Sequence, residues 1–396
     1  MTQATTQDFV KFGFTEDHQA VYDMVWRYSM EELHPLLEKM DLEDWFPEEK
    51  LRSLNEIGLL GVTIPEAYGG QGLDLVSQCA AAEAMAYWNH PFAISWLGSE
   101  NVCAHNIVRN ASEEIKQKYL PRLCDGSAVG ALGCTEPGAG SDIFGSMKST
   151  AIRDGDRYII NGRKMFITNG TIADMVLVYA LTDPDRGAKG VSAFVVEKNF
   201  SGYGVAQKLD KMGWRGSPTA ELVFDDMEVP AENLVGQENG GIAVVMSGLN
   251  IERVLMCFFS LGIAQRALDL AVDYARHRKQ FGRPIGEFQL VQALLADMYT
   301  DIETMRSFSY QMVKEIAGLE IGGGGRGEIH KRSAAVTLHN GRALNRVLDN
   351  GVQVFGGMGF MRESEINQLY RGGKVLEIAP GSTQIRQVII GEELLR

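Results

Sequence analysis

Residues 132–146 read LGCTEPGAGSDIFGS, and the pattern of the chain changes at this stretch. Before it, apolar residues recur at steps of three and four, as in VSQCAAAEAMAYW (76–88), which is typical of helices. After it, the period falls to two in RYIINGRKMFITNG (157–170), which is typical of strands, and long helical periodicity returns from Gly241. The chain is therefore predicted to be an α+β multidomain protein with an N-terminal helical domain (1–127), a central β-barrel domain (128–240) and a C-terminal four-helix bundle (241–396).

The glycine-rich stretch itself suits a polar ligand. Gly138 and Gly140 let a ligand approach the backbone closely, and Thr135 and Ser141 add hydroxyl groups, which fits a cofactor or a phosphate. It is not a GxGxxG loop that opens a βαβ unit, because strands follow it, so a nicotinamide-binding Rossmann fold is disfavoured. A plain turn before a barrel strand is the competing interpretation.

Composition narrows the class of protein. Of the 396 residues, 45% are hydrophobic, and 38 basic against 51 acidic residues give a net charge of −13, which opposes binding to nucleic acid or anionic membranes. The five cysteines form no CxxC pair, so neither a disulfide framework nor a metal site is predicted. The N-terminal sequence has no signal-peptide pattern and no apolar run reaches the length of a membrane span, so a cytoplasmic protein is expected.

Further motifs follow the glycine-rich stretch in a specific order. With it they make the chain resemble the acyl-CoA dehydrogenase family from Thr15 to Leu395, and the isovaleryl-CoA dehydrogenase-like branch most closely. That resemblance implies an oxidoreductase that contains FAD, acts on acyl-CoA, forms a homotetramer and passes electrons to an electron-transfer flavoprotein. The motifs are MFITNG (165–170), QKLDKMGWRGSPTAELVFDDMEVP (207–230), VVMSGLNIERVLM (244–256), HRKQFGRPIGEFQ (277–289), VQVFGGMGF (352–360) and EIAPGSTQIRQVIIG (377–391).

The resemblance also implies which residues meet the flavin. Ser141 would also face the CoA side, and Thr168 would hydrogen-bond the reactive edge of the flavin ring. Phe166 stands where the family usually has Trp, so an aromatic ring could still stack on the flavin but no indole N–H is available. Arg278 and the residues after it would reach the pyrophosphate or adenine, expected to be those of a neighbouring subunit, and a guanidinium suits pyrophosphate because it donates in a fork. A solvated charge is the alternative for Arg278, and a helix C-cap is the alternative for the Gly-Gly pair. The complete predicted cofactor set is Leu132, Cys134, Thr135, Gly140, Ser141, Phe166, Ile167, Thr168, Arg278, Phe281, Gln289, Gln353, Val354, Phe355, Gly356, Gly357, Ser382, Thr383 and Gln384.

The expected reaction needs a base for the α-proton, while the flavin takes the β-hydrogen as hydride. Many family members carry this glutamate where the present chain has Pro380, which cannot act as a base. In the isovaleryl-type branch the base precedes an arginine on the first helix of the C-terminal domain, which here is Glu252 before Arg253. An ordinary acidic residue in a helical first turn is the alternative for Glu252.

Pro380 also lacks the backbone N–H that polarises the thioester carbonyl in relatives. Either the flavin ribityl chain and a neighbour such as Gly381 hold the carbonyl, or the substrate is not a simple aliphatic thioester. Asn250 and Arg253 would hold the substrate or the loop geometry.

Residues near 96 fall where relatives line the acyl pocket. Ile94, Trp96 and Gly98 favour a short, branched or cyclic acyl group, although packing of Trp96 in the N-terminal core is the alternative. The predicted function is FAD-dependent α,β-dehydrogenation of such a thioester. Its alternatives are the enoyl-CoA reductase direction, redirected chemistry such as a desulfinase or a monooxygenase-like flavoprotein, and a degenerate CoA-binding subunit without turnover.

Overall fold

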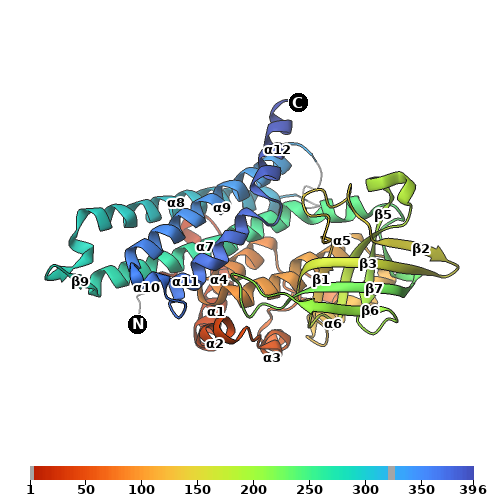
Figure 1. Ribbon diagram of the computed structural model, residues 1–396, viewed down its shortest axis with the longest axis horizontal. Coiled ribbons are helices and arrows are strands. Elements are labelled where there is room, and N and C mark those ends of the chain that lie inside the picture. Colours follow the sequence, from red (N-terminus) through yellow and green to blue (C-terminus); the bar gives the residue numbers. More distant parts are fainter. Residues whose placement is uncertain (1–3, 320–325) are drawn as a thin grey trace.

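The computed structural model describes residues 4–319 and 326–396. The strands of the large sheet gather at one end of its longest axis, and long C-terminal helices extend to the other end (Figure 1). This is the predicted succession of helical, β and helical regions. The first helical region contains α1 (Glu16–Tyr28), α2 (Leu37–Glu43), α3 (Glu48–Arg52), α4 (Leu75–Ser99), the π-helical turn η6 (Glu100–His105), α5 (Asn106–Asn110) and α6 (Glu113–Cys124).

Helix α4 is the central element of the N-terminal region. Asp74 caps it by accepting a hydrogen bond from the Ser77 backbone N–H at 2.8 Å. Apolar residues surround the helix on all sides, so it is buried almost throughout and packs against α1 and α7. The chain then continues through η6 into α5, which places both short helices beside the sheet and the start of α7.

The strands form one eight-stranded sheet in the order β6-β7-β3-β2-β4-β5-β8, with β1 parallel to β4. β4 is buried along its whole length. Its odd-numbered side chains pack against α5 and α6, and its even-numbered ones form a second apolar cluster with β3 and β7, as expected of a sheet that curls toward a barrel. The strands are β1 (Gly130–Gly133), β2 (Thr150–Asp154), β3 (Arg157–Thr168), β4 (Met175–Leu181), β5 (Val191–Glu197), β6 (Tyr203–Lys208), β7 (Thr219–Pro230) and β8 (Leu234–Val235).

The C-terminal region is built on α7, which by length and composition could cross a membrane. It packs instead against α4, α8 and α9, and most of its apolar stretch is buried within the chain's own core. After α7 (Gly241–His277) come β9 (Lys279–Gln280), β10 (Arg283–Pro284), α8 (Gln289–Ala317), α9 (Glu328–Phe355), α10 (Gly357–Phe360), α11 (Glu365–Gly373) and α12 (Thr383–Leu394).

The five cysteines are all buried and unbonded. Cys79 of α4 and Cys257 of α7 lie in the helical core, and the other three lie in the apolar layer between the sheet and α5–α6. Burial raises the pKa of Cys134 and of Cys257 to about 12.

Candidate active site

A buried ion pair anchors the glycine-rich loop that follows β1. The Lys164 ammonium of β3 lies 2.7 Å from the Glu136 carboxylate and also donates to the Cys134 carbonyl at 3.3 Å. Glu136 in turn accepts the backbone N–H groups of Lys148 and Ser149 at 2.7 and 3.0 Å. The Glu136 carboxylate, near the start of the loop, therefore binds the end of the loop at Lys148 and Ser149. Both charged residues lie within the quoted motifs, but their pairing was not predicted.

The middle of this loop is open to a ligand. A side chain at Gly138 or Gly140 would meet no atom within 4 Å, and Ser141 is exposed. Leu132 and Thr135 are partly exposed, whereas Cys134 is buried. Rigid ends and a free, glycine-rich middle fit a segment along which a polar cofactor lies.

The end of β3 presents an aromatic ring on the surface. An irregularity in the β3–β7 pairing between Lys164 and Ile167 places Phe166 at φ 62°, with 67% of its surface exposed. Ile167 is buried and Thr168 is partly exposed. A large exposed ring on a strained backbone is unusual in a protein without a ligand, and it fits the predicted stacking against a flavin.

The turn after Thr168 is fastened to α4. The Asn169 side-chain amide donates to the carbonyls of Ser95 and Gly130 at 2.8 and 3.1 Å. A Cβ on Gly98 would lie 3.2 Å from both the Asn169 amide nitrogen and a Thr168 methyl carbon. Gly98 thus permits the close approach of α4 to this turn, in addition to any role in shaping an acyl pocket.

The three residues predicted to line the acyl pocket occupy different environments. Ile94 is partly exposed, and Gly98 lies against Thr168. Trp96 is fully buried in the helical core, where its indole N–H donates to the Leu59 carbonyl at 2.6 Å. Its position agrees with the alternative role in core packing.

Glu252 lies on α7 and keeps partial contact with solvent although its carboxyl is deep among protein atoms. Burial raises the pKa of this carboxyl to about 7, and the positive charges of Arg253 and Arg109 oppose the increase. Among the residues that the structure describes, no donor bonds to the Glu252 carboxylate and no cation pairs with it directly. A carboxyl without a described hydrogen-bond donor and with a pKa near neutrality has the properties of a general base.

The neighbours Asn250 and Arg253 are turned toward α9. The Arg253 guanidinium lies 3.2 Å from the Ser333 hydroxyl and 3.3 Å from His330 Nδ1. Ser333 also donates to the Asn250 side-chain oxygen at 2.8 Å. These contacts hold this part of α7 against α9, and burial lowers the pKa of Arg253 to about 10.

The loop before α12 is held by a residue whose role was not predicted. Arg386 is fully buried and donates to the carbonyls of Leu376 and Pro380 at 2.9 and 3.4 Å. Gly381 is exposed at φ 75°, and no described residue accepts its N–H. Arg386 lies inside the quoted motif, but its targets are backbone carbonyls, which leave no pattern in a sequence.

The last predicted cofactor residues of this loop begin α12. Ser382 caps the helix by accepting the Ile385 N–H at 3.3 Å. Thr383 donates to the Glu377 carbonyl at 3.1 Å, and Gln384 is exposed.

The second predicted cofactor group lies at the opposite end of the molecule, near β9 and α10 (Figure 1). The rings of Tyr274 and Phe355 stack with centroids 4.2 Å apart, which joins the ends of α7 and α9. The structure therefore brings Arg278, Phe281, Gln289 and Gln353–Gly357 to one end of the bundle, but it does not bring them to the glycine-rich loop. Arg278, Gln289 and Gln353 are exposed, and Phe281 is 94% exposed.

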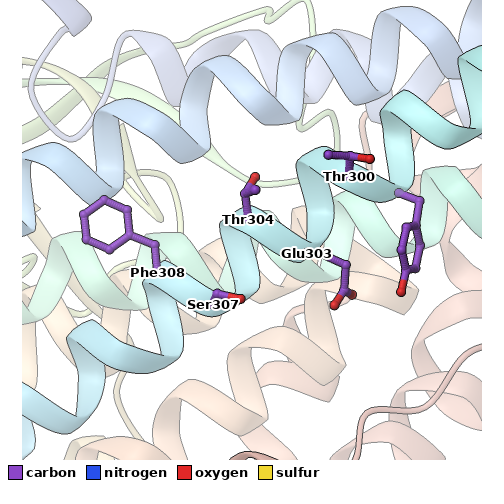
Figure 2. A pocket seen from close by; sticks show the side chains of 6 residues that line it. Thr300, Glu303, Thr304, Ser307 and Phe308 are labelled. Atoms are coloured by element: carbon purple, nitrogen blue, oxygen red, sulfur yellow. The ribbon is translucent and has the colours of Figure 1, made fainter.

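An open hollow on α8 lies apart from all predicted site residues. Figure 2 shows the side chains around it, which come from successive turns of this single helix. It is lined by Tyr299, Thr300, Glu303, Thr304, Ser307 and Phe308.

Comparison with known proteins agrees with this architecture. Three family models match: "Acyl-CoA dehydrogenase, N-terminal domain" at residues 15–127, the middle domain at 131–227 and the C-terminal domain at 239–395. The chain is 42% identical to 2-methylacyl-CoA dehydrogenase of Solanum tuberosum, over 94% of this chain and 89% of that protein. It is 40% identical to isovaleryl-CoA dehydrogenase of the same organism, over 97% of this chain and 92% of that protein.

A solved structure has the same fold over its full length. It carries the name "Electron transferring flavoprotein of Acidaminococcus fermentans: Towards a mechanism of flavin-based electron bifurcation". The TM-score is 0.92 at 36% identity, with 97% of this chain and 99% of that chain covered.

Proposed function

This chain belongs to the acyl-CoA dehydrogenase family, and from that premise we propose that it dehydrogenates a short, branched or cyclic acyl-CoA thioester with Glu252 as the base and FAD as the cofactor. Members of this family are oxidoreductases that act on the CH–CH group of acyl-CoA. The observation that carries the proposal is the carboxyl of the partly exposed Glu252, which has no described hydrogen-bond donor and whose pKa burial raises to about 7.

Glu252 is suited to remove the α-proton for two reasons. A carboxyl with a pKa near 7 is largely ionised just above neutral pH and is more basic than an exposed glutamate. It also has no described hydrogen-bond donor to give up before it accepts a proton. Pro380 leaves the alternative position of the family base without a carboxylate.

FAD, when bound, accepts the β-hydrogen as hydride. The exposed ring of Phe166, the open backbone at Gly138–Ser141 and the hydroxyl of Thr168 fit one side of such a group. Arg278, Gln289 and Gln353–Gly357 would bind the pyrophosphate and adenine of a flavin in a second copy, because they lie at the other end of their own chain. We therefore propose a homotetramer.

The thioester carbonyl needs a donor other than residue 380. Gly381 offers an exposed N–H without a described acceptor, one residue beyond Pro380. Arg386 fixes the carbonyl of Pro380 and so limits the movement of this donor. We propose that the Gly381 N–H polarises the carbonyl, and a bound FAD would supply a ribityl hydroxyl as a further donor.

The acyl group and the electron acceptor are proposed from relatives. The relatives named for 2-methylacyl-CoA and isovaleryl-CoA support a branched substrate. The solved structure named for the electron transferring flavoprotein of Acidaminococcus fermentans supports an electron-transfer flavoprotein as acceptor. The proposed compartment is the cytoplasm.

Anaerobic bleaching of the flavin absorbance by a panel of acyl-CoA esters tests the function. We expect rapid bleaching by isovaleryl-CoA or 2-methylacyl-CoA and slower bleaching by long straight chains. Absence of bleaching by every saturated ester, with oxidation of the reduced protein by enoyl-CoA, would show the reductase direction. A purified protein that binds CoA but contains no flavin would refute the proposal and indicate a CoA-binding subunit.

A further inference from the structure

We propose that Arg109 is a positioning residue for Glu252, because its guanidinium is held over α7 by Asn106, His105 and the absence of a side chain at Gly248. This inference rests on the proposed function, in which Glu252 must be ionised to accept a proton. Arg109 belongs to α5 in the N-terminal region, so one of the two positive charges that act on the base comes from a different region of the chain.

Two side chains fix the orientation of Arg109. One guanidinium nitrogen, Nη2, donates to the Asn106 side-chain oxygen at 3.1 Å, and the other, Nη1, lies 3.2 Å from His105 Nδ1. A guanidinium can only donate, so His105 Nδ1 must accept. Burial and the nearby positive charge lower the pKa of His105 to about 3, which keeps the imidazole neutral and able to accept.

Gly248 makes the position of Arg109 possible. A Cβ there would lie 2.2 Å from Arg109 Nη2 and 2.9 Å from the Asn106 side-chain oxygen. Gly248 is one helical turn before Glu252, so the guanidinium crosses α7 next to the base. The neighbouring bond from the Asn110 amide to the Ser247 hydroxyl, at 3.0 Å, holds α5 against this turn.

Glu252 is the nearby anion that Arg109 faces. In the described part of the chain, no carboxylate forms a direct ion pair with Arg109, and its Nε is buried without an acceptor. Among the described carboxylates, Glu252 is the one whose charge acts on the pKa of Arg109, which burial lowers to about 10. Arg109 thus stays protonated throughout the range in which Glu252 titrates.

Among the other groups that interact with Glu252, two are neutral near pH 7 and one is a cation. Tyr179 of β4 and Cys134 after β1 have pKa values raised by burial and are neutral near pH 7. Arg253 is a cation with a larger effect than Arg109 on the pKa of Glu252, and its guanidinium is bonded to Ser333 and His330 of α9. Arg109 therefore adds a positive charge from α5 to that of Arg253 on α7 itself.

The experiment compares variants of the flavin-loaded enzyme. Arg109→Gln removes the charge, Arg109→Lys keeps it, and Gly248→Ala displaces the flexible end of the guanidinium while leaving its charge. Arg122→Gln is the matched control, because Arg122 pairs with Glu197 on α6 and β5 and is outside the site. The readouts are the pH dependence of flavin reduction and the infrared titration of the Glu252 carboxyl, identified by its loss in Glu252→Gln.

We expect the acidic limb and the carboxyl titration to move up by about one pH unit in Arg109→Gln, which lowers the rate at pH 7 roughly fivefold. Gly248→Ala should give a smaller shift in the same direction, and Arg109→Lys should lie closer to the wild type. An infrared titration unchanged in both Arg109→Gln and Gly248→Ala would overturn the inference. If the wild-type flavin is not bleached, the proposed reaction fails, but the infrared titration still decides the role of Arg109.

Discussion

Glu100 and Glu252 are two carboxyl groups whose pKa burial raises to about 7, but their surroundings differ. Glu100 in η6 is 2% exposed and accepts the backbone N–H groups of Gly61 and Val62, each at 3.0 Å. Glu252 on α7 is partly exposed as a residue, and its carboxyl interacts with two cations without a described bond to either. A shifted pKa therefore does not identify a catalytic group by itself. The two carboxyls differ in that described backbone donors bond to Glu100 and no described donor bonds to Glu252.

The largest expected effect concerns Glu252. Glu252→Gln should lower the rate of flavin reduction by about 10²- to 10⁴-fold, because the amide cannot accept the α-proton. Flavin content and thermal stability should remain close to those of the wild type, since no described bond is lost. Stopped-flow absorbance under anaerobic conditions measures the rate, and fast bleaching in this variant would refute Glu252 as the base.

An intermediate effect is expected at Glu100. Glu100→Gln places an amide N–H₂ opposite one of two backbone donors, so the free energy of unfolding should fall by about 1–3 kcal/mol. Flavin reduction should change little at a temperature where the variant is folded. Unfolding of the loaded enzyme and stopped-flow rates of the same sample measure the two quantities. A loss of flavin-reduction rate as large as that of Glu252→Gln would show that Glu100 also takes part in the reaction.

The smallest effect on the reaction is expected at Trp96. Its indole N–H bonds to Leu59, close in sequence to Gly61 and Val62, which bond to Glu100. Trp96→Phe removes the indole donor and leaves a small cavity, which should cost about 1–2 kcal/mol of unfolding free energy. The ranking of acyl-CoA esters by initial rate should be unchanged. A new preference for longer or broader acyl groups would instead show that Trp96 lines the acyl pocket.

The sequence predicted the fold well because the spacing of apolar residues depends directly on local structure, with a period of two in strands and steps of three and four in helices. The alternation in RYIINGRKMFITNG became β3, and the continuous apolar pattern from Gly241 became α7. The confirmed family resemblance supplied the expected cofactor and the candidate base, although those site residues remain predictions.

The contacts that position the site could not be predicted from the sequence. Arg109 is one charged residue in a short helix, and only the folded chain shows that it crosses Gly248. Glu136 and Lys164 occur in separate motifs, and their ion pair depends on the approach of β1 to β3. Trp96 was compatible with a pocket or a core, and only its bond to Leu59 reveals the core position.

The buried cysteines can report when regions of the folded protein open to solvent. Thiolates, rather than thiols, react with alkylating agents, and burial raises the pKa of every cysteine in this chain. The folded enzyme should therefore resist alkylation and peroxide near neutral pH. The rate at which Cys79 or Cys257 is alkylated would measure how fast α4 separates from α7. The rate for Cys134 would measure how fast the glycine-rich loop is released.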